Sequence, residues 1–395
     1  MIPPRPHPFT RSKFAERADK LIAKVWEHGL DEKPLLEPEY LWNVGAKGYS
    51  REDEVSLRCE EDVADFRLRL ENICVSLRDA NLNSLGHTMA YGQLKGAIRT
   101  RHALGRFWRE KPETAATQIA PPIIVLGQMR SGTTRVQRLL AADPQFSGTR
   151  FCDSHNPAPL RPDVRPLKAR AALFLARRLN PWLDTTHPFG AVRTDEEIGW
   201  LSAALSPPAL EAQWRIPAYR DFSEARDPSP VYREFARILR TDAAFHDNAR
   251  RPRVLKCPQF AEDLPALLEQ FPNARIVQCR RDTNDVLASS VSMVASQMAF
   301  QSEERDVASL EREWLRKILL REQRMTSALH EFSGRMAKVD FARLNTDWRG
   351  AIADAYASLG LEFTADAETA MKRERTRSRG APHTRHRIQL EKFAS

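Results

Sequence analysis

The chain has 395 residues, 42% hydrophobic and 29% charged, so it can bury a large core. It contains no apolar run of the roughly 18 residues that a membrane span needs and no N-terminal secretory signal, so we expect a cytoplasmic protein. Six of its nine formal positive charges come from residues 371–387, which predicts a local anion site or a flexible basic tail and argues against a nucleic-acid partner.

Residues 10 to about 110 are predicted to be helical. Apolar side chains recur every three or four positions from Phe14 to Val25 and again within residues 52–80. A break at residues 30–48 separates the two patterns. We therefore interpret residues 1–118 as an N-terminal helical region packed on the rest of the chain.

The character of the sequence changes after residue 118. Residues 123–126 (IIVL) form a short, continuous apolar run, as in a parallel strand buried on both faces. The loop GQMRSGTT (127–134) follows, and then a helix that Asp143 and Pro144 end. Strand, glycine-containing loop and helix together are the context of a phosphate-binding loop.

Further strands are predicted at residues 253–256, 274–279 and 337–341, each followed by a helical pattern. Asp282 or Thr283 can cap one of these helices. The alternation predicts an α/β fold with a mainly parallel, P-loop-like sheet flanked by helices. We expect this domain at residues 119–370, with an acceptor-side insertion around 150–250 and a basic C-terminal segment at 371–395.

The loop at 127–134 differs from an ATP-binding Walker A loop in one respect. Gly127, Gly132 and Thr134 are in register with G-x-x-x-x-G-K-[ST], but Thr133 occupies the lysine position. The helix N-terminus still favours an anion, and side-chain donors are available from Arg130, Ser131, Thr133 and Thr134. A P-loop kinase or NTPase with a degenerate loop, or a non-catalytic nucleotide-binding protein, remain alternatives.

Two motifs resemble those of sulfotransferases, enzymes that bind 3′-phosphoadenosine 5′-phosphosulfate (PAPS). The stretch PPIIVLGQMRSGTTRVQRLLAADP resembles their 5′-phosphosulfate loop, with Met129 where proline is common. FPNARIVQCRRDTNDVLASSVSM resembles their 3′-phosphate site, which implies that Arg281 and Ser289 hold that phosphate; Thr283 replaces the usual proline. The resemblance is closest to the bacterial and carbohydrate-acting type.

Other residues take their roles from the same resemblance. VLKCPQF resembles the family's K-x-P element, which implies that Lys256 contacts the bridging oxygen and the leaving phosphate. Arg130 is expected to hold the phosphosulfate end beside it. In relatives a C-terminal basic stretch covers the nucleotide, so Arg385 and Arg387 are candidates, with a solvated tail as the alternative.

The acceptor hydroxyl, or amine, needs a general base, and several residues are candidates. Asp153 ranks first because a relative's glutamate lies shortly after the loop helix. His187 ranks second and Glu197 third, with Glu196 beside it. No His, Cys or carboxylate cluster has metal-ligand spacing, so no metal is expected.

The acceptor itself is left open between a small molecule, a lipid and a carbohydrate. The insertion is irregular, proline-rich and aromatic, as lids and acceptor walls often are. Its aromatic residues could line an acceptor pocket, although core packing is the stronger interpretation: Trp182, Phe189, Trp200, Trp214 and Tyr219. The basic and apolar stretch 165–178 is suited to an acidic glycan or to peripheral membrane contact.

Overall fold

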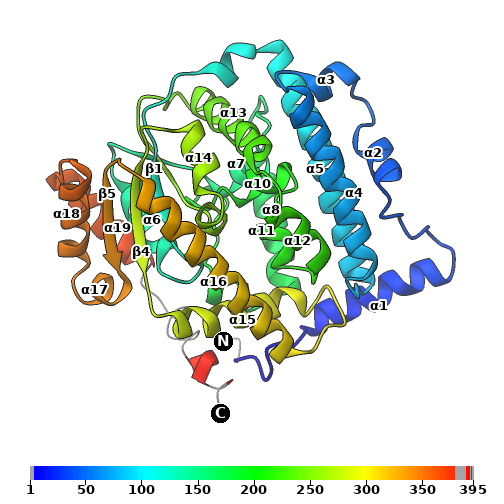
Figure 1. Cartoon of the computed structure of the whole chain (residues 1–395). Coiled ribbons are helices and arrows are strands. Elements are labelled where there is room, and N and C mark those ends of the chain that lie inside the picture. The colour runs from blue at the N-terminus through cyan, green and yellow to red at the C-terminus, as the bar shows by residue number, and fades with distance from the viewer. Residues whose placement is uncertain (1–3, 379–387, 392, 394–395) are drawn as a thin grey trace.

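Helices at the N-terminal end form one side of the molecule (Figure 1). The structure is a computed structural model that describes residues 4–378, 388–391 and 393. The first helices are α1 (Lys13–Glu27), α2 (Pro38–Gly45), α3 (Arg51–Val55), α4 (Glu60–Arg78) and α5 (Ser84–Glu110), followed by the 3-10 helix η1 (Pro112–Ala116). They pack around a core that includes Phe66, Leu70 and Ile98 and that they share with Trp214 of the segment between β2 and β3.

The boundaries within this region differ from those predicted. Residues 30–48 were predicted as a break, but they contain α2, which Pro38 begins because proline fits the first turn of a helix. Residues 52–80 were predicted as one pattern and form two helices. Ser50 caps α3, and Leu57 has a positive φ of 55°, a conformation that interrupts the helix.

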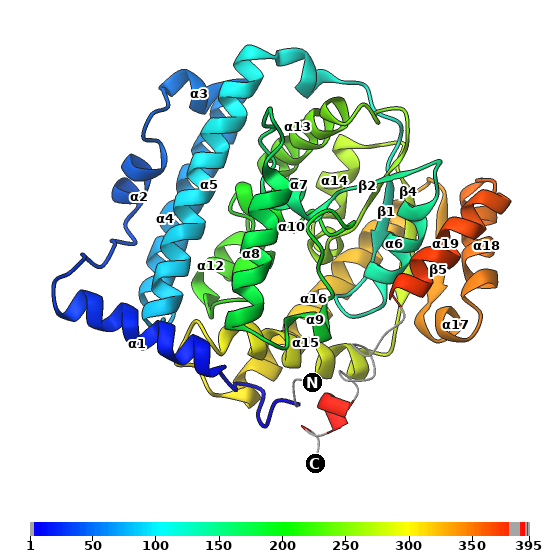
Figure 2. The same ribbon diagram turned by 180° about the vertical axis from the view of Figure 1, so that it is seen from behind.

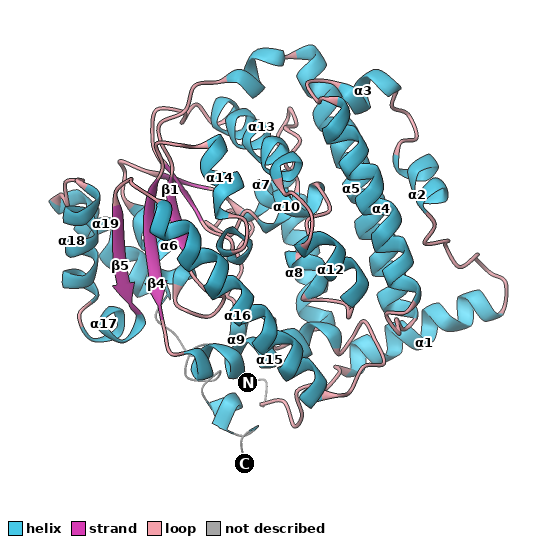
Figure 3. Cartoon of the chain, in the orientation of Figure 1, coloured by secondary structure: helices cyan, strands magenta, loops and turns pink. Residues whose placement is uncertain are grey.

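A single parallel sheet organises the rest of the described chain (Figure 3). Its strands are β1 (Ile123–Leu126), β2 (Ser147–Gly148), β3 (Arg253–Leu255), β4 (Arg275–Arg280) and β5 (Met336–Asp340), in the order β2-β3-β1-β4-β5. The predicted α/β fold is confirmed. Only β2 was not predicted, because two residues carry no periodicity.

Helices cover both faces of this sheet. Ile124 and Leu126 of β1 point into a core with Trp200 and Phe235, whereas Ile123 and Val125 point into a second core on the opposite face. The helices that flank the two faces or carry the site are α6 (Thr133–Ala142), η2 (Pro258–Ala261), α14 (Leu264–Gln270), α15 (Thr283–Met298), α16 (Val307–Glu331), α17 (Phe341–Thr346), α18 (Trp348–Leu359) and α19 (Ala365–Ser378).

The insertion between β2 and β3 is more regular than its proline content suggested. It contains α7 (Phe151–His155), α8 (Arg165–Leu179), α9 (Leu183–Thr186), α10 (Ile198–Ala203), α11 (Pro208–Glu211), α12 (Pro217–Glu224) and α13 (Ser229–Phe245). Several of these helices have proline in the first turn, where the missing N–H costs nothing. Trp200, Trp214 and Tyr219 are buried in the core, as ordinary packing predicts.

Candidate functional site

Three sequence segments meet at the carboxyl edge of the sheet. The loop at 127–134 follows β1, Lys256 follows β3 and Arg281 follows β4. Because β3, β1 and β4 are neighbours and all parallel, their carboxyl ends lie side by side. This edge is where open α/β sheets bind ligands.

The loop after β1 needs its two glycines. Gly127 has a φ of +146° and Gly132 a φ of +90°, which residues with a Cβ rarely adopt. A Cβ at Gly127 would lie 2.7 Å from the Cys279 carbonyl oxygen, and one at Gly132 would lie 2.7 Å from the Phe341 ring. The tight loop leads directly into α6, whose N-terminus offers backbone N–H groups to an anion.

Two guanidinium groups lie together beside the loop. Arg130 Nε donates to Ser289 Oγ at 2.8 Å, and Arg281 Nη1 donates to the Arg130 carbonyl oxygen at 2.9 Å. Burial, and next the positive charge of Arg281, lower the pKa of Arg130 to about 10. A bound dianion would raise the pKa of Arg130 again, because its negative charge favours the charged form of both guanidinium groups.

Lys256 connects the loop to the insertion. Its Nζ donates to Thr134 Oγ1 at 3.3 Å and forms a very short ion pair with Glu196. The lysine is 2% exposed, so it enters the site from a buried strand end. Glu196 therefore neutralises the cation that points at the loop.

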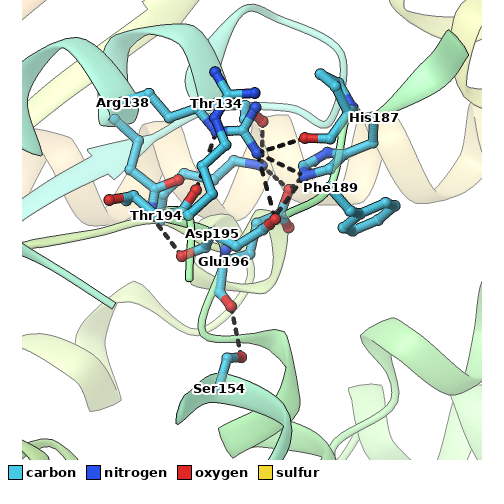
Figure 4. A network of polar contacts seen from close by, with 12 residues as sticks. Thr134, Arg138, Ser154, His187, Phe189, Thr194, Asp195 and Glu196 are labelled. Atoms are coloured by element: carbon cyan, nitrogen blue, oxygen red, sulfur yellow. Dashed lines mark hydrogen bonds and ion pairs between the residues drawn. The ribbon is translucent and has the colours of Figure 1, made fainter. Parts of the chain in front are cut away.

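His187 lies close to the same Glu196 side chain (Figure 4). Its Nε2 is 2.9 Å from Asp195 Oδ1, and its Nδ1 is 3.9 Å from Glu196 Oε1. A carboxylate can only accept, so the neutral tautomer that donates from Nε2 to Asp195 has its lone pair on Nδ1. Burial alone would raise the pKa of Asp195, but His187 and Arg138 lower it to about 2.

Glu197 contacts the backbone of Lys256 and not its side chain. Its Oε2 accepts a hydrogen bond from the Lys256 backbone N–H at 2.7 Å, and the side chain is fully buried. Burial raises its pKa to about 8. The group is therefore mostly protonated at neutral pH and holds the segment after β3 in place.

Asp153 lies in a different cluster, although we ranked it first as the base. Arg150 Nε is 2.5 Å, Arg165 Nη2 3.1 Å and His246 Nε2 3.2 Å from its oxygens. Burial would raise the pKa of Asp153, but these partners hold it below its usual range. These contacts favour a structural role, because the carboxylate is occupied by cations and lacks a contact with Lys256.

Two groups of three side chains among the described residues have ligand atoms close enough for a metal ion. They are Asp153, Asp242 and His246, and His187, Asp195 and Glu196. In both groups the carboxylates already form ion pairs with Arg or Lys, namely Arg150, Arg165, Arg253, Arg138 and Lys256. The sequence interpretation that no metal is needed stays a prediction.

The structure thus brings the loop residues, Lys256, Arg281 and Ser289 into one set of contacts, and adds His187 through Glu196. Arg385 and Arg387 lie outside the described residues. Sequence reasoning missed Arg138 and Asp195. The spacing of Arg138 four residues after Thr134 was a signal for the first, since residues four apart share a helix face.

A phosphate-type loop, a strand-end lysine and a paired arginine thus meet at the carboxyl edge of a P-loop-like α/β sheet. The chain belongs to the sulfotransferase family, whose profile matches residues 121–365. The resemblance seen in its two motifs is therefore confirmed at the level of the family.

Relatives with curated names match part of the chain. Proteins named omega-hydroxy-beta-dihydromenaquinone-9 sulfotransferase Stf3, from Mycobacterium bovis and Mycobacterium tuberculosis, are each 26% identical over 195 residues. That alignment covers 47% of this chain and 48% of theirs, so the chain spans about half the length of the curated relatives it matches.

Two solved structures share the fold. Sulfotransferase STF1 from Mycobacterium tuberculosis has a TM-score of 0.75 at 24% identity, covering 92% of this chain and 100% of that one. Sulfotransferase STF9 from Mycobacterium avium has a TM-score of 0.76 at 17% identity, covering 92% and 94%. Within the residues described here, no helix has both the length and the apolar character needed to cross a bilayer.

Proposed function

We propose that this sulfotransferase uses PAPS as its donor and transfers the sulfuryl group to a hydroxyl of an apolar, lipid-like acceptor. One observation carries the donor assignment: Lys256 contacts Thr134 while Arg281 and Ser289 both contact Arg130. Cations from the ends of β3 and β4 and a hydroxyl from α15 thereby contact the loop after β1. A nucleotide with phosphates at both ends of its ribose fits such a two-part cationic site.

Each donor residue has a role that follows from its place. The loop from Gly127 to Thr134 and the N-terminus of α6 hold the 5′-phosphosulfate. Arg281 and Ser289, together with Arg130, hold the 3′-phosphate by charge-assisted hydrogen bonds. Lys256 moves from Glu196 to the oxygen that bridges phosphorus and sulfur and stabilises its developing charge.

The transfer is an in-line displacement at sulfur. The acceptor oxygen forms a bond to sulfur as the bond from sulfur to the bridging phosphate oxygen breaks, and adenosine 3′,5′-bisphosphate leaves. His187 receives the acceptor proton on Nδ1, since its Nε2–H is held by Asp195. His187 therefore replaces Asp153 as our first candidate for the base.

The surroundings of His187 suit an apolar acceptor. Its ring centroid is 4.4 Å from that of Phe189, which lies 5.5 Å from Phe151; Phe151 in turn lies 4.3 Å from His155. Aromatic walls around a polar reacting group are typical of pockets for largely apolar ligands. The name of the Stf3 relatives points to a hydroxylated quinone lipid, which agrees with this chemistry.

Donor binding is tested by thermal stabilisation with adenosine 3′,5′-bisphosphate, Mg·ATP and adenosine 5′-monophosphate. We expect selective stabilisation by the bisphosphate, of about 2.7 kcal/mol at one hundred times Kd. Arg281→Ala should lose this response, whereas Arg280→Ala, at the exposed last residue of β4, should keep it. Stabilisation by Mg·ATP alone would contradict the proposal and identify a phosphoryl-transfer loop.

The base is tested by sulfate transfer from labelled PAPS to a panel of apolar alcohols. His187→Asn should lower kcat roughly 10²-fold or more while leaving bisphosphate binding unchanged. Glu196→Gln keeps the size of the side chain and should retain the pH dependence of the base. If the acidic limb of the kcat profile disappears in Glu196→Gln and persists in His187→Asn, Glu196 is the base instead.

A further inference from the structure

Helix α8 presents an apolar stripe that the rest of the described chain leaves uncovered. Leu167, Phe174 and Leu175 are 62%, 63% and 52% exposed, and Ala171 lies among them. Spacings of four, three and one place these four residues on one side of the helix. The opposite side, with Arg165, Ala169 and Leu173, is buried.

Basic side chains border the stripe on both sides. Lys168 lies on one flank and Arg170 on the other, while Arg178 lies at the end of the stripe with its guanidinium 5.2 Å from the Phe174 ring. None of the ion pairs among the described residues involves these three cations. The helix has no acidic residue, so the whole face is positive.

Helix α1 extends this face. Ser12 Oγ, at the start of α1, donates to the Leu179 carbonyl oxygen at the end of α8 at 2.8 Å, and Figure 2 shows α1 crossing that end of α8. Phe14 and Leu21, two helical turns apart, are 43% and 64% exposed, and Arg17 and Lys24 are exposed beside them. The two helices thus combine apolar side chains with a basic border.

We propose that this face of α8 and α1 docks on the surface of an anionic lipid bilayer. Interfacial helices show this pattern: their apolar side chains enter the acyl boundary, and the cations on either side meet the headgroups. An acidic glycan would use the cations but would leave Phe174 and Leu175 in water. A symmetric dimer would place the basic border of one copy against that of the other.

The same helix links the docking face to the acceptor side. Ala169 and Leu173, on the inner side of α8, pack in one cluster with Phe151 and Phe189, and Phe189 lies beside His187. A lipid acceptor could then enter from the bilayer next to the base. This consequence rests on the proposed function, whereas membrane docking itself does not.

The test is co-sedimentation with vesicles of phosphatidylglycerol and phosphatidylcholine, without donor or acceptor. The unaltered chain should bind these vesicles and bind pure phosphatidylcholine more weakly. Phe174→Ser with Leu175→Ser should lower the partition constant about tenfold or more, because two apolar side chains no longer enter the boundary. Lys168→Gln with Arg170→Gln should weaken binding to the anionic vesicles only.

A matched control lies on the opposite side of the molecule. Leu315→Ser with Leu319→Ser changes two exposed leucines of α16 (38% and 55% exposed) and should leave partitioning unchanged. Melting curves report whether each variant is folded. The proposal would be overturned if the α8 variant (Phe174→Ser with Leu175→Ser) and the α16 variant bound vesicles equally, or if the unaltered chain bound no vesicles. A dimer that depends on Phe174 and Leu175 would also overturn it. Each of these outcomes leaves the donor assignment intact.

Discussion

Two clusters of charged side chains differ in how they are balanced. Around Asp153, inside the insertion, Arg150, Arg165 and His246 surround the carboxylate, and Arg253 pairs with Asp242. At the carboxyl edge of the sheet, Arg130 and Arg281 lie together, Arg281 pairs with the exposed Asp285, and burial and next the charge of Arg281 lower the pKa of Arg130. Carboxylates match the arginines in the first cluster, whereas two adjacent arginines, one with a lowered pKa, are suited to an anionic ligand.

Removal of charge from the balanced cluster should have the largest effect. Asp153→Asn leaves Arg165, whose side chain is fully buried, with one carboxylate fewer. We expect the free energy of unfolding to fall by about 3–5 kcal/mol, because Arg150 and Arg165 both lose this buried partner and keep only the more exposed Asp163. Urea denaturation at pH 7 measures the change.

An exposed ion pair provides the control for Asp153→Asn. Arg177 and Asp184 are 2.7 Å apart and each is 41% exposed, so Asp184→Asn should cost less than about 1 kcal/mol. Folded Asp153→Asn protein should retain sulfate transfer. Complete loss of transfer at full stability would return Asp153 to the role of base.

Lys256→Met should have the next largest effect, on catalysis. The substitution keeps an unbranched chain of similar length and removes the cation that, in the proposed mechanism, stabilises the leaving phosphate. We expect kcat to fall about 10²–10³-fold. Lys338→Met, at an exposed position of β5, should leave kcat unchanged. A variant that raised KM alone would show that Lys256 only binds the donor.

The sequence was informative where a function is carried by contiguous residues. The loop after β1, the strand before Arg281 and the cap at Asp282 were predicted because each motif lies within one strand, turn and helix. The ranking of the base stays a prediction; the contacts of Asp153 with Arg165 and His246 were not foreseen, because these side chains approach Asp153 only after the insertion folds. Asp195 was missed for the same reason: its partners, His187 and Arg138, lie on separate elements.

Glu197 predicts a pH dependence of stability. The folded-state pKa of about 8 lies above the ordinary value of 4.5. Between these values the unfolded chain releases a proton that the folded protein keeps, so stability falls as pH rises and the loss is complete above about 8. The slope is up to about 1.4 kcal/mol per pH unit for this group.

Glu197→Gln should remove that slope while keeping an acceptor for the Lys256 N–H. Urea denaturation at several pH values from 5 to 8 measures it in the variant and in the unaltered chain. Glu331→Gln, at an exposed position, should leave the slope as it was. An unchanged slope in Glu197→Gln would mean that this carboxyl is ionised in the folded protein.

Ser289→Ala should have the smallest effect and sharpens the comparison most. Ser289 and Ser290 are neighbours on α15, and both are buried, but only the Ser289 hydroxyl accepts from Arg130, at 2.8 Å. If Ser289 donates to the 3′-phosphate, its loss should cost about 0.5–1.5 kcal/mol, or roughly a three- to tenfold rise in Kd for adenosine 3′,5′-bisphosphate. Ser290→Ala should leave that Kd unchanged.

Isothermal titration with adenosine 5′-monophosphate as a second ligand isolates the effect, because a monophosphate without the 3′ group should not distinguish the two variants. Equal losses for both ligands in Ser289→Ala would mean that the hydroxyl positions Arg130 for the loop as a whole, and the boundary between the two halves of the donor site would then lie elsewhere on α15.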